Sequence, residues 1–141
     1  MCKLGDIIVI DKYIGEDGME VNKHSFVVIN DQPDFIEGLR YDFVTNVMSS
    51  FKSIEHRRKK LKFMENIEIV SKDIISEIPK NKHSGFIKAD QLIYFDKSKI
   101  NYYVFGHVSE ELLNKLMLVM LTLSKNNKLR NNTNNLVENN N

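Results

Sequence analysis

A single histidine stands where a polar loop meets an apolar run. His24 follows Asn22 and Lys23 and leads into Phe-Val-Val-Ile at residues 26–29, a pattern typical of a buried strand. Imidazoles exchange protons near neutral pH, so a histidine at the mouth of a strand is a candidate general acid or base. An isolated histidine more often has a structural role, for example at the end of a loop. The sequence leaves both roles open.

Hydroxyl and amide side chains gather in a second stretch, Thr-Asn-Val-Met-Ser-Ser at residues 45–50. Thr45, Asn46, Ser49 and Ser50 could donate hydrogen bonds to a phosphate group. The same residue types also end strands and begin turns. This stretch alone does not separate the two interpretations.

The most uneven charge in the chain lies at residues 52–62. This block carries six lysines and arginines and one glutamate, whereas residues 1–51 carry four basic and nine acidic residues. Lysine and arginine displace counterions from nucleic acids and position the backbone without reading its sequence. The block therefore indicates a phosphate-binding surface, unless it is only a solvated loop or a short polar helix. Its cations are Lys52, Arg57, Arg58, Lys59, Lys60 and Lys62.

The composition argues against several other classes of site. The four histidines share no metal-ligand spacing, Cys2 is the single cysteine, and no P-loop, dinucleotide fingerprint or Ser-His-Asp signature is present. We therefore expect no metal and no cofactor. The sequence has no run of eighteen apolar residues and no signal-peptide pattern, so we expect a cytoplasmic protein without membrane contact.

Short β-rich segments separated by turn residues predict a mainly β domain, a small barrel or a sandwich. One helix is predicted over residues 109–123, with Ser109 as its N-cap. Nearly every position from Leu112 to Leu123 is apolar, so we expect both the core and something further, such as a second subunit, to cover this helix. Residues 126–141 include nine asparagines and little apolar content, which predicts a disordered tail after a single domain at residues 1–125.

Taken in order, several motifs resemble the PemK/MazF family of toxins from bacterial toxin–antitoxin systems. "GDIIVID" is similar to the opening strand of that family, and "GMEVNKHSFVVIND" to its following loop and second strand. "FVTNVMSS", "SGFIKADQLIYFDKSKI" and "FGHVSEELLNKLMLVMLTL" resemble later motifs, the last one running into the terminal helix. The resemblance covers roughly residues 4–123 in co-linear order, and the Asp-Gln, Asp-Lys-Ser and Ser-Glu-Glu-Leu-Leu parts are the most specific.

The resemblance implies an SH3-like barrel with a C-terminal helix, assembled as a homodimer. Members of the family are metal-free endoribonucleases that cut single-stranded RNA through attack of the 2′-hydroxyl on the adjacent phosphate. A cognate antitoxin neutralises them by laying an acidic segment over the RNA groove. RNA, a second copy of the chain and an antitoxin are therefore the expected partners.

Three positions depart from the family pattern. The arginine at the mouth of the second strand falls on His24, the threonine falls on Met48 beside Ser49, and a second arginine falls on Ile93, although Asp90 and Gln91 remain. We therefore expect His24 as the acid or base and Ser49 as the phosphate donor. The expected RNA contacts are Lys23, Asn46, Arg57, Arg58, Lys59, Lys60 and Gln91. Two alternatives are a barrel that binds nucleic acid or a protein without cleavage, and a structural adaptor in which residues 52–62 are only solvated.

Overall fold

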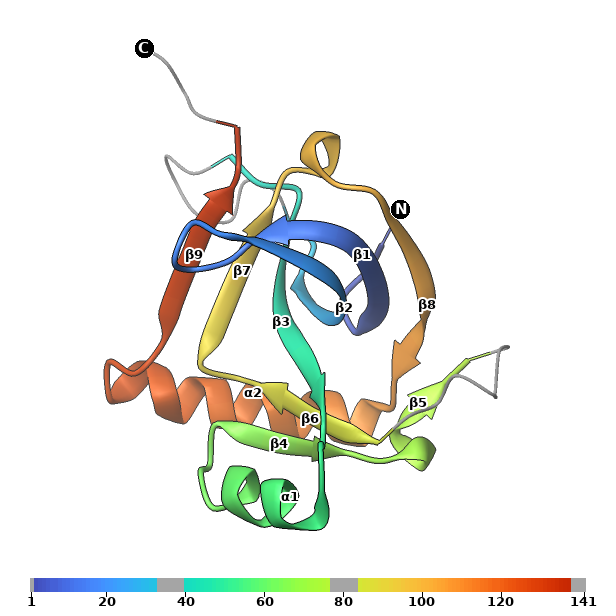
Figure 1. Ribbon diagram of the computed structural model, residues 1–141, viewed down its shortest axis with the longest axis vertical. Helices are drawn as coiled ribbons and strands as arrows, with labels where there is room; N and C mark the ends of the chain where they lie inside the picture. The colour runs from blue at the N-terminus through green and yellow to red at the C-terminus, as the bar shows by residue number, and fades with distance from the viewer. Residues whose placement is uncertain (1, 33–39, 77–83, 138–141) are drawn as a thin grey trace.

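The computed structural model describes residues 2–32, 40–76 and 84–137. Their strands form one strongly curled sheet in the order β4-β6-β3-β2-β1-β8-β5, with β7 beside β3 and β9 beside β7 (Figure 1). All pairs are antiparallel except β7 with β9. The prediction of a mainly β, barrel-like domain is confirmed. The strands are β1 (Asp6–Ile14), β2 (Glu20–Asn30), β3 (Phe43–Ser50), β4 (Asn66–Ile69), β5 (Ile74–Ile75), β6 (Gly85–Lys88), β7 (Gln91–Phe95), β8 (Tyr102–Val108) and β9 (Arg130–Asn135).

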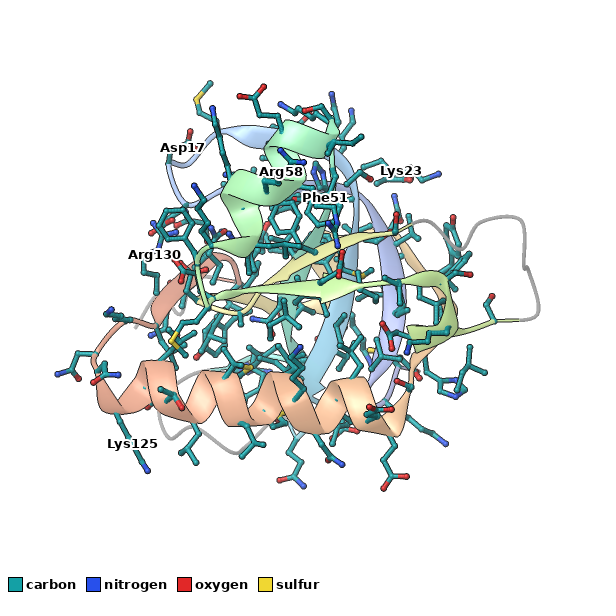
Figure 2. All side chains as sticks on the ribbon, turned by 90° about the horizontal axis from the view of Figure 1, so that it is seen from below. Asp17, Lys23, Phe51, Arg58, Lys125 and Arg130 are labelled. Atoms are coloured by element: carbon teal, nitrogen blue, oxygen red, sulfur yellow. The ribbon has the colours of Figure 1, made fainter. Side chains whose placement is uncertain are left out.

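Two α-helices accompany the sheet, α1 (Ile54–Leu61) and α2 (Glu110–Lys125), with short 3-10 turns at η1 (Ser71–Asp73) and η3 (Lys97–Lys99). Seen from below, α1 and α2 lie on opposite sides of the sheet (Figure 2). No helix in the described ranges is long and apolar enough to span a membrane.

Each face of the sheet has its own core. One face, which we call the α2 face, packs Ile7, Val27 and Ile69 against Leu112, Leu116 and Leu123 of α2. The other, which we call the aromatic face, carries Tyr13 together with Phe26, Phe43, Phe95 and their aliphatic neighbours. The rings of Phe26 and Phe95 meet edge-on with their centroids 5.3 Å apart, the geometry that aromatic quadrupoles favour. Because side chains alternate along a strand, the strand register assigns each residue to one of these faces.

The helix predicted at residues 109–123 is confirmed and extends to Lys125. The Ser109 hydroxyl accepts a hydrogen bond from the backbone N–H of Leu112 at 3.2 Å, as expected of an N-cap. Leu118 and Leu121 on the outer side are 66% and 53% exposed, so the described residues cover only one side of α2.

Replacing Ser109 by alanine should lower the free energy of unfolding by about 1 kcal/mol, because one N–H at the start of α2 loses its acceptor. Denaturant unfolding measures this change. Ser124→Ala is the matched control, since Ser124 is exposed near the other end of the same helix and should change stability by less than about 0.5 kcal/mol. Equal effects of the two changes would contradict the capping role.

The predicted disorder of residues 126–141 is wrong for the part that the structure describes. β9 pairs with β7 in parallel, and Leu136 is buried in the core that contacts α2. The asparagine side chains hold β9 in place by hydrogen bonds, which apolar side chains cannot form. The amides of Asn132 and Asn135 both donate to the carbonyl of Ile14, and the Asn135 side-chain oxygen accepts from the Ile14 N–H at 2.6 Å. Residues 138–141 lie outside the described ranges.

Candidate functional site

A groove with a volume of about 610 Å³ opens on the α2 face, between the ends of β2 and β3 and the strands β5, β6 and β8. Its floor is largely apolar, and its polar groups are hydroxyls, two ammonium groups and one imidazole. The apolar lining residues include Ile7, Val9, Met48, Ile69, Ile74 and Phe105. The polar ones are Lys23, His24, Ser25, Ser49, Ser50, Lys52, Ser84 and Tyr103.

The strand register shows which side chains point into this groove. Tyr103 of β8 lies opposite Val9 of β1, Val9 lies opposite Ser25 of β2, and Ser25 lies opposite Met48 of β3. Directly opposed residues in antiparallel strands share a face. These four side chains therefore form one row across four strands on the α2 face.

His24 borders the groove, but its imidazole leaves β2 on the aromatic face. There it lies edge-on to the ring of Tyr13, with the centroids 5.9 Å apart. Its Nδ1 is 2.9 Å from the carbonyl oxygen of Asn22. Since a carbonyl can only accept, Nδ1 carries a proton and donates it, so in the neutral ring Nε2 holds a free lone pair. His24 is thus oriented as a proton acceptor through Nε2.

Ser49 also lies on the aromatic face, because it is opposite Phe86 and one position after Met48. The β2–β3 ladder ends at Ser25 and Met48. His24 and Ser49 therefore stand just beyond the last rung of this ladder, on the same face. The structure brings the two predicted catalytic residues to one strand end, although 24 and 49 are far apart in the chain.

Two lysines flank this strand end. Lys23 is exposed and holds its Nζ 5.9 Å from the centroid of the Tyr103 ring. Lys52 is also exposed and lines the groove just after β3. An anion in the groove would meet both ammonium groups.

The basic block forms α1, which has no buried residue. The ring of His56 lies 6.1 Å from the ring of Phe86, which is opposite Ser49 and therefore on the aromatic face. Phe51 stacks on Phe86, and Arg57 bonds Glu68 at 2.7 Å, so Arg57 is partly neutralised. In Figure 2, Arg58 and Lys23 both lie in the upper part of the view, and α2 lies at the bottom. Desolvation and the neighbouring lysines, Lys60 first, lower the pKa of His56. Positive charge is therefore concentrated around α1.

Two predicted RNA contacts lie outside the groove. Asn46 is 0% exposed and donates its amide to the carbonyl of Gln91 at 2.8 Å, so it acts inside the fold and cannot reach a ligand at the surface. Gln91 lines a separate cavity of about 50 Å³ with Tyr13 and Arg130. Arg130 is paired there with Glu16 and Asp90. Neither residue joins His24 and Ser49.

Sequence reasoning missed Ser25, Tyr103 and Phe105 as groove residues. The two-residue alternation of β2 and β8 indicates which residues share a face of each strand. Only the register shows that these residues of the two strands align across β1. In the described part of the chain, no cluster of three or more His, Cys, Asp or Glu residues could hold a metal ion. Comparison of the chain with protein-family models and with curated proteins finds no match.

Proposed function

We propose that this chain is an RNA-binding protein of the PemK/MazF type that cleaves single-stranded RNA without a metal. The observation that carries the proposal is the strand end where Lys23, His24, Ser49 and Lys52 border one groove. These four residues supply a proton acceptor, a hydroxyl donor and two cations. Cleavage of RNA through its own 2′-hydroxyl needs these groups.

The reaction uses the free edge at the end of the β2–β3 ladder. RNA that leaves the groove across this edge passes from Lys23 on one side to His24 on the other. Nε2 of His24 accepts the proton of the 2′-hydroxyl, and the 2′-oxygen forms a bond to the adjacent phosphorus. The bond from phosphorus to the 5′-oxygen breaks, the 5′-oxygen takes up a proton from a water molecule, and the proton gained by His24 returns to solvent. The products are a 2′,3′-cyclic phosphate and a 5′-hydroxyl.

The remaining groups stabilise charge on the phosphate. Lys23 and Lys52 neutralise its non-bridging oxygens, and the Ser49 hydroxyl donates a hydrogen bond to one of them. α1 extends the positive surface beyond the groove and holds the backbone on either side of the cleaved bond.

Side-chain alternation favours a second candidate, RNA binding without cleavage. The groove side chains Ser25, Met48 and Tyr103 project on the α2 face, whereas the imidazole of His24 projects on the aromatic face. An RNA that stays within the groove would contact Lys23 and Lys52 but not Nε2. Incubation of purified protein with single-stranded RNA in EDTA separates the two functions, because only the first gives new RNA ends while both give a complex.

The resemblance also carries proposals about assembly. The exposed Leu118 and Leu121 of α2 support a homodimer of SH3-like barrels. A cognate antitoxin would place an acidic segment over Lys23, Lys52 and α1, in a cytoplasmic setting.

Changing Arg58 and Lys60 to glutamine should weaken RNA binding and its dependence on salt. Each lost phosphate contact on a single strand should reduce the slope of log K against log salt by about 0.7, hence by about 1.4 for the pair. Titrations at several salt concentrations measure this slope. Lys115→Gln with Lys125→Gln on α2 removes the same charge from the other side of the molecule and should leave the slope unchanged. Equal slopes for the two double variants would show that α1 does not contact RNA.

A further inference from the structure

Tyr103 is an exposed aromatic residue inside the groove that the reaction above does not use. Its side chain is 50% exposed, although it belongs to the row that continues through Val9, Ser25 and Met48. Phe105, two residues further along β8, is half-buried beside it and also lines the groove. The groove therefore offers a ring with a free surface next to an apolar floor.

A cation lies over that ring. Nζ of Lys23 lies 5.9 Å from the ring centroid, within the range of a cation–π contact. At an exposed site such a contact is weak, whereas stacking of a nucleobase on an aromatic side chain is stronger. A base can thus displace the ammonium group, which then becomes free to bind phosphate.

We propose that Tyr103 is the stacking platform for one unpaired nucleobase, and that Lys23 covers its ring until RNA binds. This inference rests on the proposed function and narrows its substrate class. The RNA must carry an unpaired base that can leave the stack of its neighbouring bases. Every base has a π-face, so the platform accepts any of them and excludes a base held in a duplex. The phosphate next to that base meets Lys23, which places the backbone at the strand end that carries His24.

A single-stranded RNA with one 2-aminopurine tests the stacking directly, since its fluorescence falls when the base stacks and the chain has no tryptophan to interfere. The wild-type protein should quench this fluorescence. Tyr103→Leu should abolish the quenching and weaken binding by about 5- to 100-fold, the range expected for one base–aromatic stack. Tyr103→Phe keeps an aromatic ring and should therefore retain both the quenching and the affinity of the wild type. Val104→Ala is the matched control on the other face of β8 and should change neither.

A strand of the same length without bases separates this inference from the proposed function. Tyr103→Leu should bind this abasic strand as tightly as the wild type does, because only the phosphate contacts remain. If the wild-type protein binds base-bearing and abasic strands equally, or if Tyr103→Leu quenches like the wild type, the stacking inference is wrong and RNA binding stands. If the wild-type protein binds neither strand, the proposed function itself is overturned. Thermal unfolding of each variant confirms that it is folded.

Discussion

A chain that ends at Lys128 should be less stable than the full chain by about 5 kcal/mol. The truncation removes the buried side chain of Leu136, worth about 1.5–3 kcal/mol, and several amide hydrogen bonds worth about 1 kcal/mol each. It also leaves the edge of β7 without a partner. Small domains have only about 5–15 kcal/mol of stability in total, so the truncated chain should lose its cooperative transition or unfold at a much lower temperature. Calorimetry or denaturant unfolding measures the change.

A point variant keeps this prediction testable if the truncated chain does not fold. Asn135 is 3% exposed and bonds both the N–H and the carbonyl of Ile14, so Asn135→Ala should cost about 1–3 kcal/mol by leaving a donor without a partner. Thr133→Ala changes an exposed side chain of the same strand and should have almost no effect. Unfolding free energies of the truncated chain and of Asn135→Ala that equal the wild-type value would show that β9 contributes nothing to the fold.

His24→Ala should slow RNA cleavage by roughly 100-fold or more, because the variant lacks the group that accepts the 2′-hydroxyl proton. Binding should change little, since the cations at Lys23, Lys52 and α1 remain. Cleavage rates under single-turnover conditions, with binding measured on an uncleavable strand, separate the two effects. His107→Ala is the matched control, because His107 is exposed on β8 and does not line the groove.

The orientation of the ring makes this test specific. The Nδ1–H of His24 donates to Asn22, so the lone pair is on Nε2. His24→Gln keeps a polar side chain of similar reach but cannot shuttle the proton, and it should be as slow as His24→Ala. Cleavage by both variants at the wild-type rate would remove His24 from the mechanism. It would also favour a role for this ring in packing against Tyr13.

The local patterns predicted much of the fold. Alternation and β-branched runs marked the strands, and Ser109 with the glutamates after it marked the start of α2. Both signals involve residues that are close together in the chain, so they can be recognised in one sequence without knowledge of the fold. The sequence predicted that α2 packs on the core, but not which of its leucines do so. Leu118 and Leu121 are exposed and Leu116 is buried, although all three have the same residue type.

The rest depends on contacts between distant segments. β9 has no alternating apolar pattern; it is held by parallel pairing with β7 and by asparagine amides that bond Ile14. Asn46 and Ser49 are three positions apart in one strand and therefore leave it on opposite faces, so one is buried and the other borders the groove. Tyr103 and Met48 share a row only through the register of β1 and β2. Residue types alone could not reveal these alignments.

Replacement of a single ribose by 2′-deoxyribose in the RNA tests the central claim most directly. The cleaved bond is first mapped with all-ribose RNA and wild-type protein in EDTA, and the ends are analysed for 2′,3′-cyclic phosphate and 5′-hydroxyl. The substitution is then made at the nucleotide whose 2′-hydroxyl would attack. We expect this strand to bind as tightly as the all-ribose strand and to remain intact at that bond. Cleavage of the substituted strand at the same bond, or intact all-ribose RNA after prolonged incubation with the wild-type protein, would contradict the account.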